Sequence, residues 1–557
     1  MMTTQIKKWD FTLLYLLLIL LPPIVYFVVL VVYSPNVPKA DDYNDSLYFL
    51  SHFIDAGTWQ DKLYYFFGQN NEHRTTTSRL IYVLMYYLHG TLNYKWLMYI
   101  GNTSIAGVAV LLACQFTSHT EKLFICCFTS VYLFHLQAWS SMFWAMTALS
   151  NYVVIFFSLI SLTLLYVPRI SSVLWASFFA VAASYSQGNG LLIWPVGGLF
   201  IVYLYYCDRN FPIRQVLPIW CVIGVSCIAA YFYHYQVSVP PVPIPSRLEV
   251  LSLEPWRPLW WFLGFLGSGF LFESANLHLS IVFGALLLIL ACGAIYTFRK
   301  TYPVLVFFTI LILCSALLAT FNRFHVFDIG LCLSSHYKIY SNYLIFIVVM
   351  AIFVHLYERH RTRIWINMLI ITLALTHTIL GYTTSLPKNS QMQTDAISRM
   401  RTWLLSSNVD DLGFFTLWIQ DANNKLVQGI AHNVWQPEYL FDNVLKVRDT
   451  TTIACLPSFN ALNPVILKMR RQPSAVVGNV FLASVNKDLL ENNILHIVYC
   501  EKNKFRQADI KFNFLDGEYT AFYSRFSDIE TANDILVQDV TGKISAIQLI
   551  PQMMANE

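Results

Sequence analysis

The sequence SPNVPKADDYNDSLYFLSHFIDAGTWQDKLYYFFGQNNEHRTTTSR, residues 34–79, is the first long polar stretch of the chain. It follows directly on an apolar run, residues 11–33, that is long enough to cross a bilayer. Ionisable side chains gather near the two ends of the stretch: Asp41, Asp42, Glu72, His73 and Arg74. Because the acidic pair follows the apolar run so closely, we expect these groups to lie at one membrane face.

The composition indicates a membrane protein with many spans. Of the 557 residues, 56% are hydrophobic and only 12% are charged, and the mean hydropathy is +0.51. Soluble domains carry far more charge than this. The net charge of +4 is small for such a length, and no long basic run is present, which excludes a nucleic-acid-binding surface.

Apolar stretches with the length of a membrane helix recur along the first two thirds of the chain. We predict eleven spans, at residues 11–33, 96–117, 123–138, 149–167, 171–186, 190–207, 216–234, 277–298, 302–320, 341–357 and 363–382. Two shorter apolar and aromatic stretches, 79–92 and 258–272, are interpreted as interfacial or re-entrant helices.

The distribution of cations between the spans sets the expected orientation. With eleven spans, every predicted inside loop carries a cation, as the positive-inside rule requires; these are Lys7, Lys8, Lys122, Arg169, Arg209, Arg214, Arg299, Lys300, Arg359, Arg361 and Arg363. The amino terminus is then cytoplasmic. The loop at residues 34–95 and the tail from residue 383 share the external face.

The tail differs sharply in composition from the rest of the chain. Residues 383–557 contain no apolar stretch of span length, and short alternating runs such as NILHIVYC predict strands. We therefore expect an all-α membrane domain over residues 1–382, followed by a soluble α+β or mostly-β extracytoplasmic domain over residues 383–557. Cys455 and Cys500 lie in this tail and could form a disulfide there.

The adjacent carboxylates are the first candidates for chemistry. Asp41 and Asp42 suit a general base and a partner that binds a substrate hydroxyl or a divalent metal ion. No cofactor is required by the sequence, and no set of residues has the spacing of a metal site. The alternative is structural, since DDYNDSLYFLSHF also has the pattern of a capped amphipathic helix.

The other end of the stretch supplies a cation. Arg74 could bind a phosphate bidentately, or it could be an interfacial arginine whose head group reaches the lipid surface. Glu72 and His73 are its neighbours and candidates for contacting a substrate. They need not form one site with Arg74, because consecutive helical residues face different ways.

Two later segments contain further candidates. Gln187 and Asn189 lie in SYSQGNGLLIWP, between two predicted spans, where a tight turn is the better interpretation. The segment RFHVFDIGLCLSSHYKIYSN, residues 323–342, is too polar for lipid and too apolar for an ordinary loop. It suits either a substrate-lining wall or an interfacial aromatic belt; its candidates are Arg323, His336, Tyr337 and Lys338.

The combination of a first span, an external loop with an acidic pair, many further spans and an external tail resembles the GT-C superfamily of membrane glycosyltransferases. The motifs NEHR (71–74), GNGLLIWP (188–195) and SSHYKIYS (334–341) are similar to those of bacterial O-antigen-modifying, serotype-converting (Gtr-type) glucosyltransferases. That group has an arginine where this chain has His336. The departure shifts the expected phosphate-binding role to Arg74, Arg323 and Lys338.

The resemblance implies a function and a location. A polyprenyl-phosphate sugar would be the donor, a surface glycan such as O-antigen would be the acceptor, and Asp41 or Asp42 would be catalytic. Remaining substrate contacts would come from Glu72, His73, Gln187, Asn189, His336 and Tyr337. The protein would lie in the bacterial inner membrane. The alternatives are a flippase or transporter of lipid-linked glycan, and an O-antigen polymerase or ligase.

Overall fold

The computed structural model describes residues 2–116, 119–237, 244–272, 276–326, 328–359, 363–406, 409–414 and 419–436, and seven strands between residues 468 and 547. The chain forms two compact units, Met1–Thr394 and Asp395–Glu557. Helix α18 runs without a break from Arg363 to Ser406, so the predicted domain boundary at residue 382 lies inside a helix. Each unit is described by itself.

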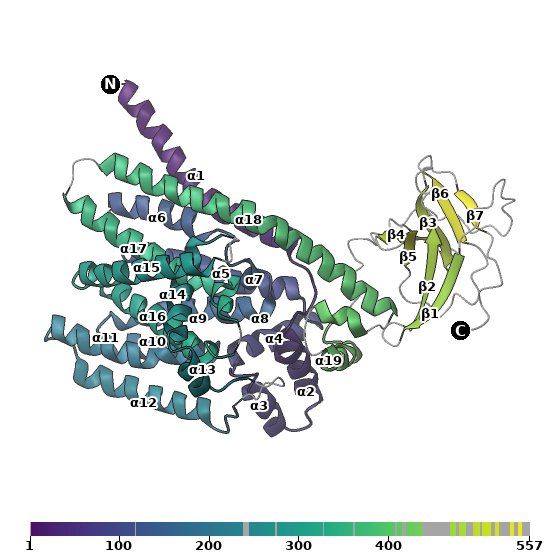
Figure 1. The fold of residues 1–557 in the computed structure, drawn as a ribbon, viewed down its shortest axis with the longest axis horizontal. Helices are drawn as coiled ribbons and strands as arrows, with labels where there is room; N and C mark the ends of the chain where they lie inside the picture. Colours follow the sequence, from purple (N-terminus) through teal and green to yellow (C-terminus); the bar gives the residue numbers. More distant parts are fainter. Residues whose placement is uncertain are drawn as a thin grey trace. The chain divides into compact units, whose positions relative to one another are not determined.

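All named secondary-structure elements among the described residues of the first unit are helices (Figure 1). Its longer helices are α1 (Met2–Tyr33), α4 (Thr76–His89), α5 (Tyr94–Cys114), α6 (His119–Leu133), α9 (Val153–Leu165), α10 (Ile170–Ser184), α11 (Ile193–Cys207), α12 (Ile213–Phe232), α14 (Arg257–Gly267), α15 (Leu277–Phe298), α16 (Pro303–Arg323), α17 (Lys338–Arg359) and α18. Its short elements are η1 (Tyr43–Tyr48), α2 (Phe49–Asp55), α3 (Trp59–Phe67), α7 (Trp139–Met142), α8 (Ala145–Thr147), η2 (Ala148–Tyr152), η3 (Gly188–Leu192), α13 (Arg247–Leu253), η4 (Ser268–Phe270), η5 (Ile329–Leu333) and η6 (Ser335–Tyr337).

Nine helices among the described residues are long and apolar enough to cross a membrane, so the multi-pass prediction is confirmed. They are Leu13–Tyr33, Tyr94–Cys114, Ala145–Leu165, Gly188–Cys207, Ile213–Phe232, Leu277–Phe298, Pro303–Arg323, Ser335–Leu356 and Trp365–Ile397. Nine of the eleven predicted spans are therefore supported, and the other two correspond to shorter helices. Lys122–Leu133 and Ile170–Ser184 are apolar but shorter, and at about 1.5 Å per residue they fall short of a hydrocarbon core of about 30 Å.

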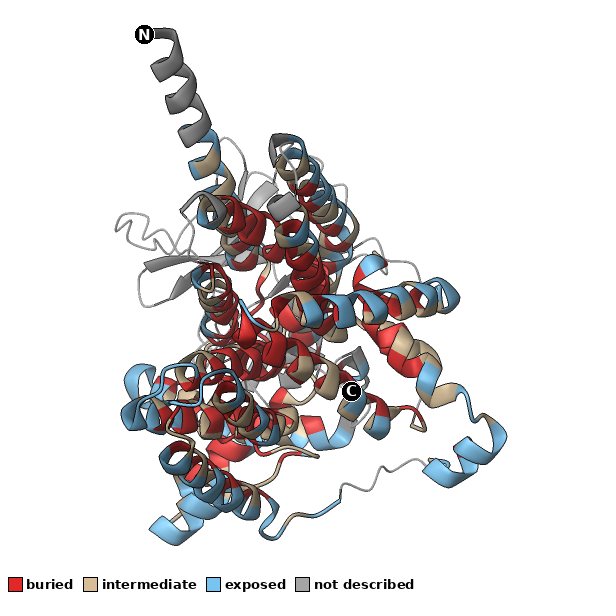
Figure 2. Ribbon diagram, turned by 90° about the vertical axis from the view of Figure 1, so that its left-hand side faces the viewer, coloured by how far each residue is buried: buried red, intermediate tan, exposed pale blue. Residues whose placement is uncertain are grey.

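Helix α14 packs against α15, α16 and α17 and is closest to α15. Gly267 of α14 lies against Gly284 of α15, and a Cβ built on either would meet backbone atoms of the other helix. Trp261 and Phe265 of α14 are buried. The stretch 258–272 therefore buries one of its faces in the bundle. Buried residues line the inside of the bundle and exposed ones its outer surface (Figure 2).

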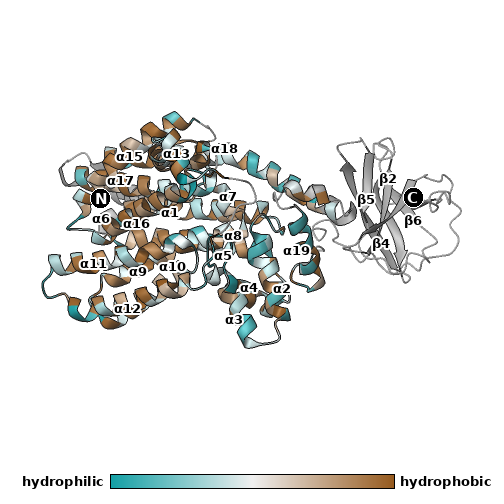
Figure 3. Ribbon diagram, turned by 60° about the horizontal axis from the view of Figure 1, so that its bottom comes forward, coloured by the Kyte–Doolittle hydropathy of each residue, from teal (hydrophilic) through white to brown (hydrophobic). Residues whose placement is uncertain are grey.

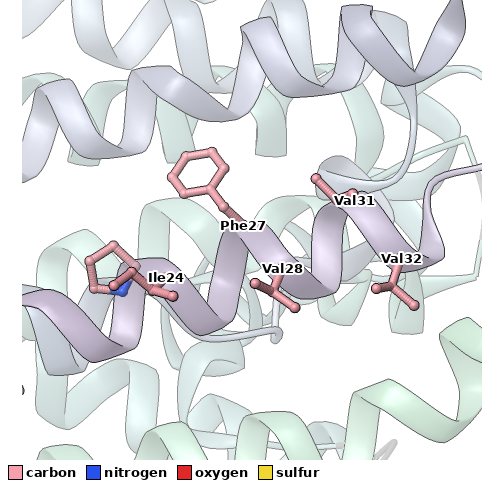
Figure 4. A pocket seen from close by; sticks show the side chains of 6 residues that line it. Ile24, Phe27, Val28, Val31 and Val32 are labelled. Atoms are coloured by element: carbon pink, nitrogen blue, oxygen red, sulfur yellow. The ribbon is translucent and has the colours of Figure 1, made fainter.

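The outer surface of α1 is apolar, as expected of a helix that faces lipid. An open pocket of about 460 Å³ lies on this helix, lined by Pro23, Ile24, Phe27, Val28, Val31 and Val32 (Figure 4). It has no ionisable lining residue and therefore offers no group for catalysis. Figure 3 shows the same apolar character along most of the other long helices, whereas hydrophilic residues are more frequent in α3, in α4 and in the second half of α18.

The first polar stretch of the sequence folds into η1, α2, α3 and α4, which lie together beside one end of the long helices (Figures 1 and 3). Thr58 caps α3 by accepting a hydrogen bond from the Asp61 backbone amide, and Gly90 ends α4 in the left-handed conformation.

The second unit contains the end of α18, η7 (Val409–Phe414), α19 (Ile419–Ala431) and one antiparallel sheet. Its strands are β1 (Lys468–Ser474), β2 (Gly478–Val485), β3 (Ile494–Glu501), β4 (Lys504–Asn513), β5 (Glu518–Phe522), β6 (Ile535–Asp539) and β7 (Ile544–Ile547), in the order β1-β2-β5-β4-β3-β6-β7. Cys455 lies outside the described residues, and so does its predicted pairing with Cys500.

Candidate active site

A tight turn at residues 70–73 presents the NEHR motif. Asn70 and His73 form a backbone bridge, with N–O distances of 2.7 and 2.9 Å, and Asn71 adopts a left-handed φ of 50°. Asparagine tolerates this conformation better than most residues. The turn projects Asn71 and Glu72 toward groups from other parts of the chain.

Three segments meet at this turn. The Asn71 side-chain amide donates to Asp41 Oδ1 at 3.1 Å, and the Arg323 guanidinium donates to Glu72 Oε2 at 3.0 Å. Arg323 is the last residue of α16, and Asp41 lies just before η1. The structure therefore brings together Asp41, Glu72 and Arg323, which we call the charged cluster.

Asp41 has the properties of a base in this cluster. Its side chain is half-buried, and burial is the main reason that its pKa is raised above the ordinary value. The negative charge of Asp45 raises the pKa further, while the hydrogen bond from Asn71 and the charge of Arg323 oppose the shift. A carboxylate with a raised pKa binds a proton more tightly than an exposed one does.

Asp42 occupies a different environment from its neighbour. It is fully buried, and its two oxygens accept hydrogen bonds from the backbone amides of Lys39, at 3.0 Å, and Met146, at 2.9 Å. Burial raises its pKa well above the usual range, against the effect of these two donors. Because one oxygen accepts from Lys39 and the other from Met146, Asp42 connects the segment before η1 to α8. Of the predicted pair, only Asp41 is accessible.

A third carboxylate, Asp45, was not among the predicted site residues. It is fully buried and accepts hydrogen bonds from Thr75 and from Tyr82, the latter at 2.9 Å, with the Arg79 Nε at 3.8 Å. Arg79 also donates to the backbone carbonyls that end α3. Asp45 thus joins η1, α3 and α4. Its position only four residues after Asp41, in the same polar stretch, was the available signal in the sequence.

Arg74 and Lys338 have a different environment from the one expected of phosphate ligands. Arg74 donates to the carbonyls of Tyr231 at 2.6 Å, Tyr233 and Phe67. Lys338 is buried and its Nζ donates to the Leu271 carbonyl at 2.6 Å. These contacts hold the loop after α12 and the end of η4 in place, so we assign both cations to the scaffold of the site.

Lys39 is a cation that sequence reasoning missed. Its Nζ lies 5.7 Å from the centre of the Trp144 ring, and burial lowers its pKa to about 8 despite the nearby Asp42. His336 interacts electrostatically with both Lys39 and Arg323. Lys39 and Arg323 are therefore two cations whose charges reach His336. Tyr337 lies within hydrogen-bonding reach of Arg323 and packs edge-on against Trp261.

Uncharged polar groups adjoin the charged cluster. His73 Nδ1 accepts a hydrogen bond from the Gly188 amide at 3.3 Å, and burial lowers the pKa of His73 to about 4. His73 is thus neutral near pH 7, with its proton on Nε2. Asn189 Nδ2 donates to the Tyr340 hydroxyl at 2.8 Å, and that hydroxyl donates to Gln187 Oε1 at 3.5 Å. Asn189 Oδ1 is buried and accepts no hydrogen bond within the described residues.

Within the part of the chain that the structure describes, no group of three or more His, Cys, Asp or Glu side chains has the arrangement of a metal site. In the charged cluster, the positive charge nearest to Glu72 is the Arg323 guanidinium. The arrangement can accept a proton at Asp41, offers the positive charges of Arg323 and Lys39 to an anion, and can hydrogen-bond to hydroxyl groups through Asn189 and His73.

No protein-family model matches this chain, and no curated protein is significantly similar to it.

Proposed function

We propose that this protein is a membrane glycosyltransferase. It moves a sugar, such as a glucose, from a polyprenyl-phosphate donor to a surface glycan at the periplasmic face of the bacterial inner membrane. The observation that supports this best is the juxtaposition of a half-buried carboxylate, Asp41, with a cation, Arg323, from a segment that is far away in sequence. The multiple apolar helices support a location in the bilayer, where a lipid-linked donor would also lie.

Asp41 is the general base in this proposal. It removes the proton from an acceptor hydroxyl as the hydroxyl oxygen forms a bond to the anomeric carbon of the donor sugar. The bond from that carbon to the phosphate oxygen breaks, and its electron pair leaves with the polyprenyl phosphate. The raised pKa of Asp41 suits it to take the proton, since a stronger base transfers it more completely.

Arg323 and Lys39 stabilise the departing phosphate. Charge develops on the phosphate oxygens as the bond breaks, and fixed cations in a water-poor site stabilise such charge strongly. Arg323 has a geometry suited to bidentate contact, and Lys39 acts as a point charge. The charges of both cations reach His336, at the position where the similar glucosyltransferases have an arginine.

The uncharged groups beside the cluster bind the sugar. Asn189 Oδ1 is a buried acceptor without a donor in the described residues, and a sugar hydroxyl would supply one. His73 and Gln187 offer further hydrogen bonds of the kind that a neutral sugar can use. Glu72 holds Arg323 in position through their 3.0 Å contact.

The test is transfer by the purified protein in lipid nanodiscs, supplied with polyprenyl-phosphate [¹⁴C]glucose and lipopolysaccharide. We expect radiolabel on the polysaccharide with the native protein and none with Asp41→Asn. Asp61→Asn, at an exposed carboxylate of α3, is the matched control and should retain transfer. Full transfer by Asp41→Asn would contradict the assignment of the base.

Mass analysis of surface glycan from cells with and without the gene separates the alternatives. A single added hexose supports the transferase. A changed chain length indicates a polymerase or ligase, and accumulated lipid-linked precursor indicates a flippase.

A further inference from the structure

Helix α4 has its polarity reversed relative to a helix on a water-exposed surface. Its exposed face is formed by Leu80, Leu84, Tyr87 and Leu88, which are 49%, 52%, 65% and 77% exposed. Positions separated by four, seven and eight residues lie on one side of a helix, so these four make a continuous stripe. The stripe contains no charged residue.

The opposite face of α4 is polar and buried. Arg79, Tyr82 and Met85 are nearly inaccessible, and the first two contact the buried carboxylate of Asp45. In water, an amphipathic helix turns its apolar side inward and its polar side outward. Helix α4 does the reverse, which is stable only where the surrounding medium is apolar.

Helix α3 adds a second apolar surface. None of its residues is fully buried, and Trp59, Leu63, Tyr64 and Phe67 are 76%, 53%, 74% and 45% exposed. The Lys62 ammonium lies 5.8 Å from the centre of the Trp59 ring. Aromatic rings beside a lysine are typical of the level where lipid head groups meet acyl chains.

The lengths and connections of these helices place them at the membrane boundary. Helices α3 and α4 have 9 and 14 residues, or about 14 and 21 Å, which is too short to cross a core of about 30 Å. Helix α4 ends at His89, and the membrane span α5 begins only a few residues later, at Tyr94. Near the start of α5, Trp96 is also exposed, so the apolar surface continues from α4 onto a span.

We propose that α3 and α4 form a lipid-contacting surface that lies in the head-group and acyl-chain boundary of one leaflet. The partner is the phospholipid of the bilayer, because the stripe on α4 is uncharged, lies next to a span and carries interfacial aromatic residues. The polar side of α4 binds Asp45, which is four residues from Asp41, so contact with lipid fixes the height of the charged cluster at the membrane surface. This inference stands independently of the proposed transfer reaction.

The experiment uses the photocrosslinking residue p-benzoylphenylalanine, introduced one site at a time into the full chain. Leu63→p-benzoylphenylalanine and Leu84→p-benzoylphenylalanine report on α3 and on the α4 stripe. Val225→p-benzoylphenylalanine, at an exposed position of the span α12, is the positive control for lipid contact. Asp61→p-benzoylphenylalanine, on the other side of α3 from Leu63, is the matched control for contact with water.

Each variant is placed in nanodiscs of phosphatidylcholine and phosphatidylglycerol, irradiated and analysed by mass spectrometry. We expect phospholipid adducts at Leu63 and Leu84 in yields within about threefold of Val225, and at least tenfold less adduct at Asp61. Adducts at the background level of Asp61, or crosslinks from Leu84 to a second protein chain, would overturn the proposal. A variant that elutes as aggregate is replaced by the neighbouring stripe position, Leu80 or Leu88.

Discussion

The Arg323 guanidinium donates a hydrogen bond to the Glu72 carboxylate at 3.0 Å, although the two residues are 251 positions apart in the sequence. Their side chains are 30% and 37% exposed. Ion pairs that water can reach contribute at most about 1 kcal/mol to stability. The contact is therefore more important for where it holds the Arg323 charge, which is beside Asp41, than for the stability of the fold.

The first prediction concerns this pair. Arg323→Gln should lower the kcat/KM of sugar transfer by about 10² to 10³-fold, because it removes a charge that stabilises the departing phosphate. Arg323→Lys should recover part of this loss, since it restores the charge without the bidentate geometry. Arg247→Gln, at an exposed arginine of α13, is the control. Equal activity of Arg323→Gln and the native protein would remove Arg323 from the site.

The second prediction distinguishes the two adjacent aspartates. In Asp42→Asn, an NH₂ group replaces one of the two carboxylate oxygens, so either the Lys39 or the Met146 backbone amide loses its acceptor. Leaving a buried donor unpaired costs about 1–3 kcal/mol. We expect a lower melting temperature and less folded protein in the membrane. Asp41→Asn should keep the native melting temperature and lose transfer. Thermal unfolding, with size-exclusion chromatography as the readout, measures the melting temperature, and radiolabel transfer measures activity. If Asp41→Asn lost stability and Asp42→Asn lost only transfer, the roles of the two residues would be exchanged.

The third prediction concerns Arg74. Its guanidinium donates hydrogen bonds to three backbone carbonyls. An ammonium group cannot reach all three, so Arg74→Lys should reduce the melting temperature. The KM for donor in the remaining folded protein should stay within about twofold of native, in contrast to Arg323→Gln. A large rise in KM at native stability would return Arg74 to the phosphate site.

The fourth prediction is a pH dependence of transfer. Asp41 must be ionised to act as a base, and its pKa is raised by burial. The rate should therefore fall as pH decreases, with the midpoint above the value of an ordinary aspartate, which is about 3.9. Asn71→Ala removes a hydrogen bond that lowers this pKa and should move the midpoint to higher pH. The pH–rate profile of kcat/KM measures both; an unshifted midpoint in Asn71→Ala assigns the titration to another group.

The fifth prediction concerns stability in acid. The pKa of His73 is lowered to about 4, whereas an unfolded histidine has a pKa of about 6.5. Between these values the unfolded chain binds a proton that the folded chain does not, so the free energy of unfolding should decrease as pH falls from about 6.5 to 4. His73→Asn keeps an acceptor for the Gly188 amide but cannot titrate. Its melting temperature should depend less on pH in this range, and an unchanged dependence would exclude His73 as the cause.

The predicted site residues fall into two groups in the structure, those that meet in the charged cluster or beside it and those bonded to the backbone. Asp41, Glu72 and Arg323 meet in one cluster, and His73 joins Gly188, beside Asn189. Arg74 and Lys338 lie in the predicted motifs, yet Arg74 donates to three backbone carbonyls and Lys338 to the Leu271 carbonyl. A motif shows which side chains are near one another, but it does not show which of them have free donors.

The sequence by itself determined that this is a multi-pass helical membrane protein, because runs of apolar residues can cross a bilayer only as helices that satisfy their own backbone hydrogen bonds. It also located the polar stretch at residues 34–79, where charge is concentrated at a span end. Only the tertiary structure decided that Asp41 is accessible, whereas Asp42 is buried and hydrogen-bonded to two backbone amides. Only the structure, too, brought Lys39 beside His336 and turned the leucines of α4 outward. Burial and hydrogen-bond partners come from residues that are distant in sequence, and so no local pattern can specify them.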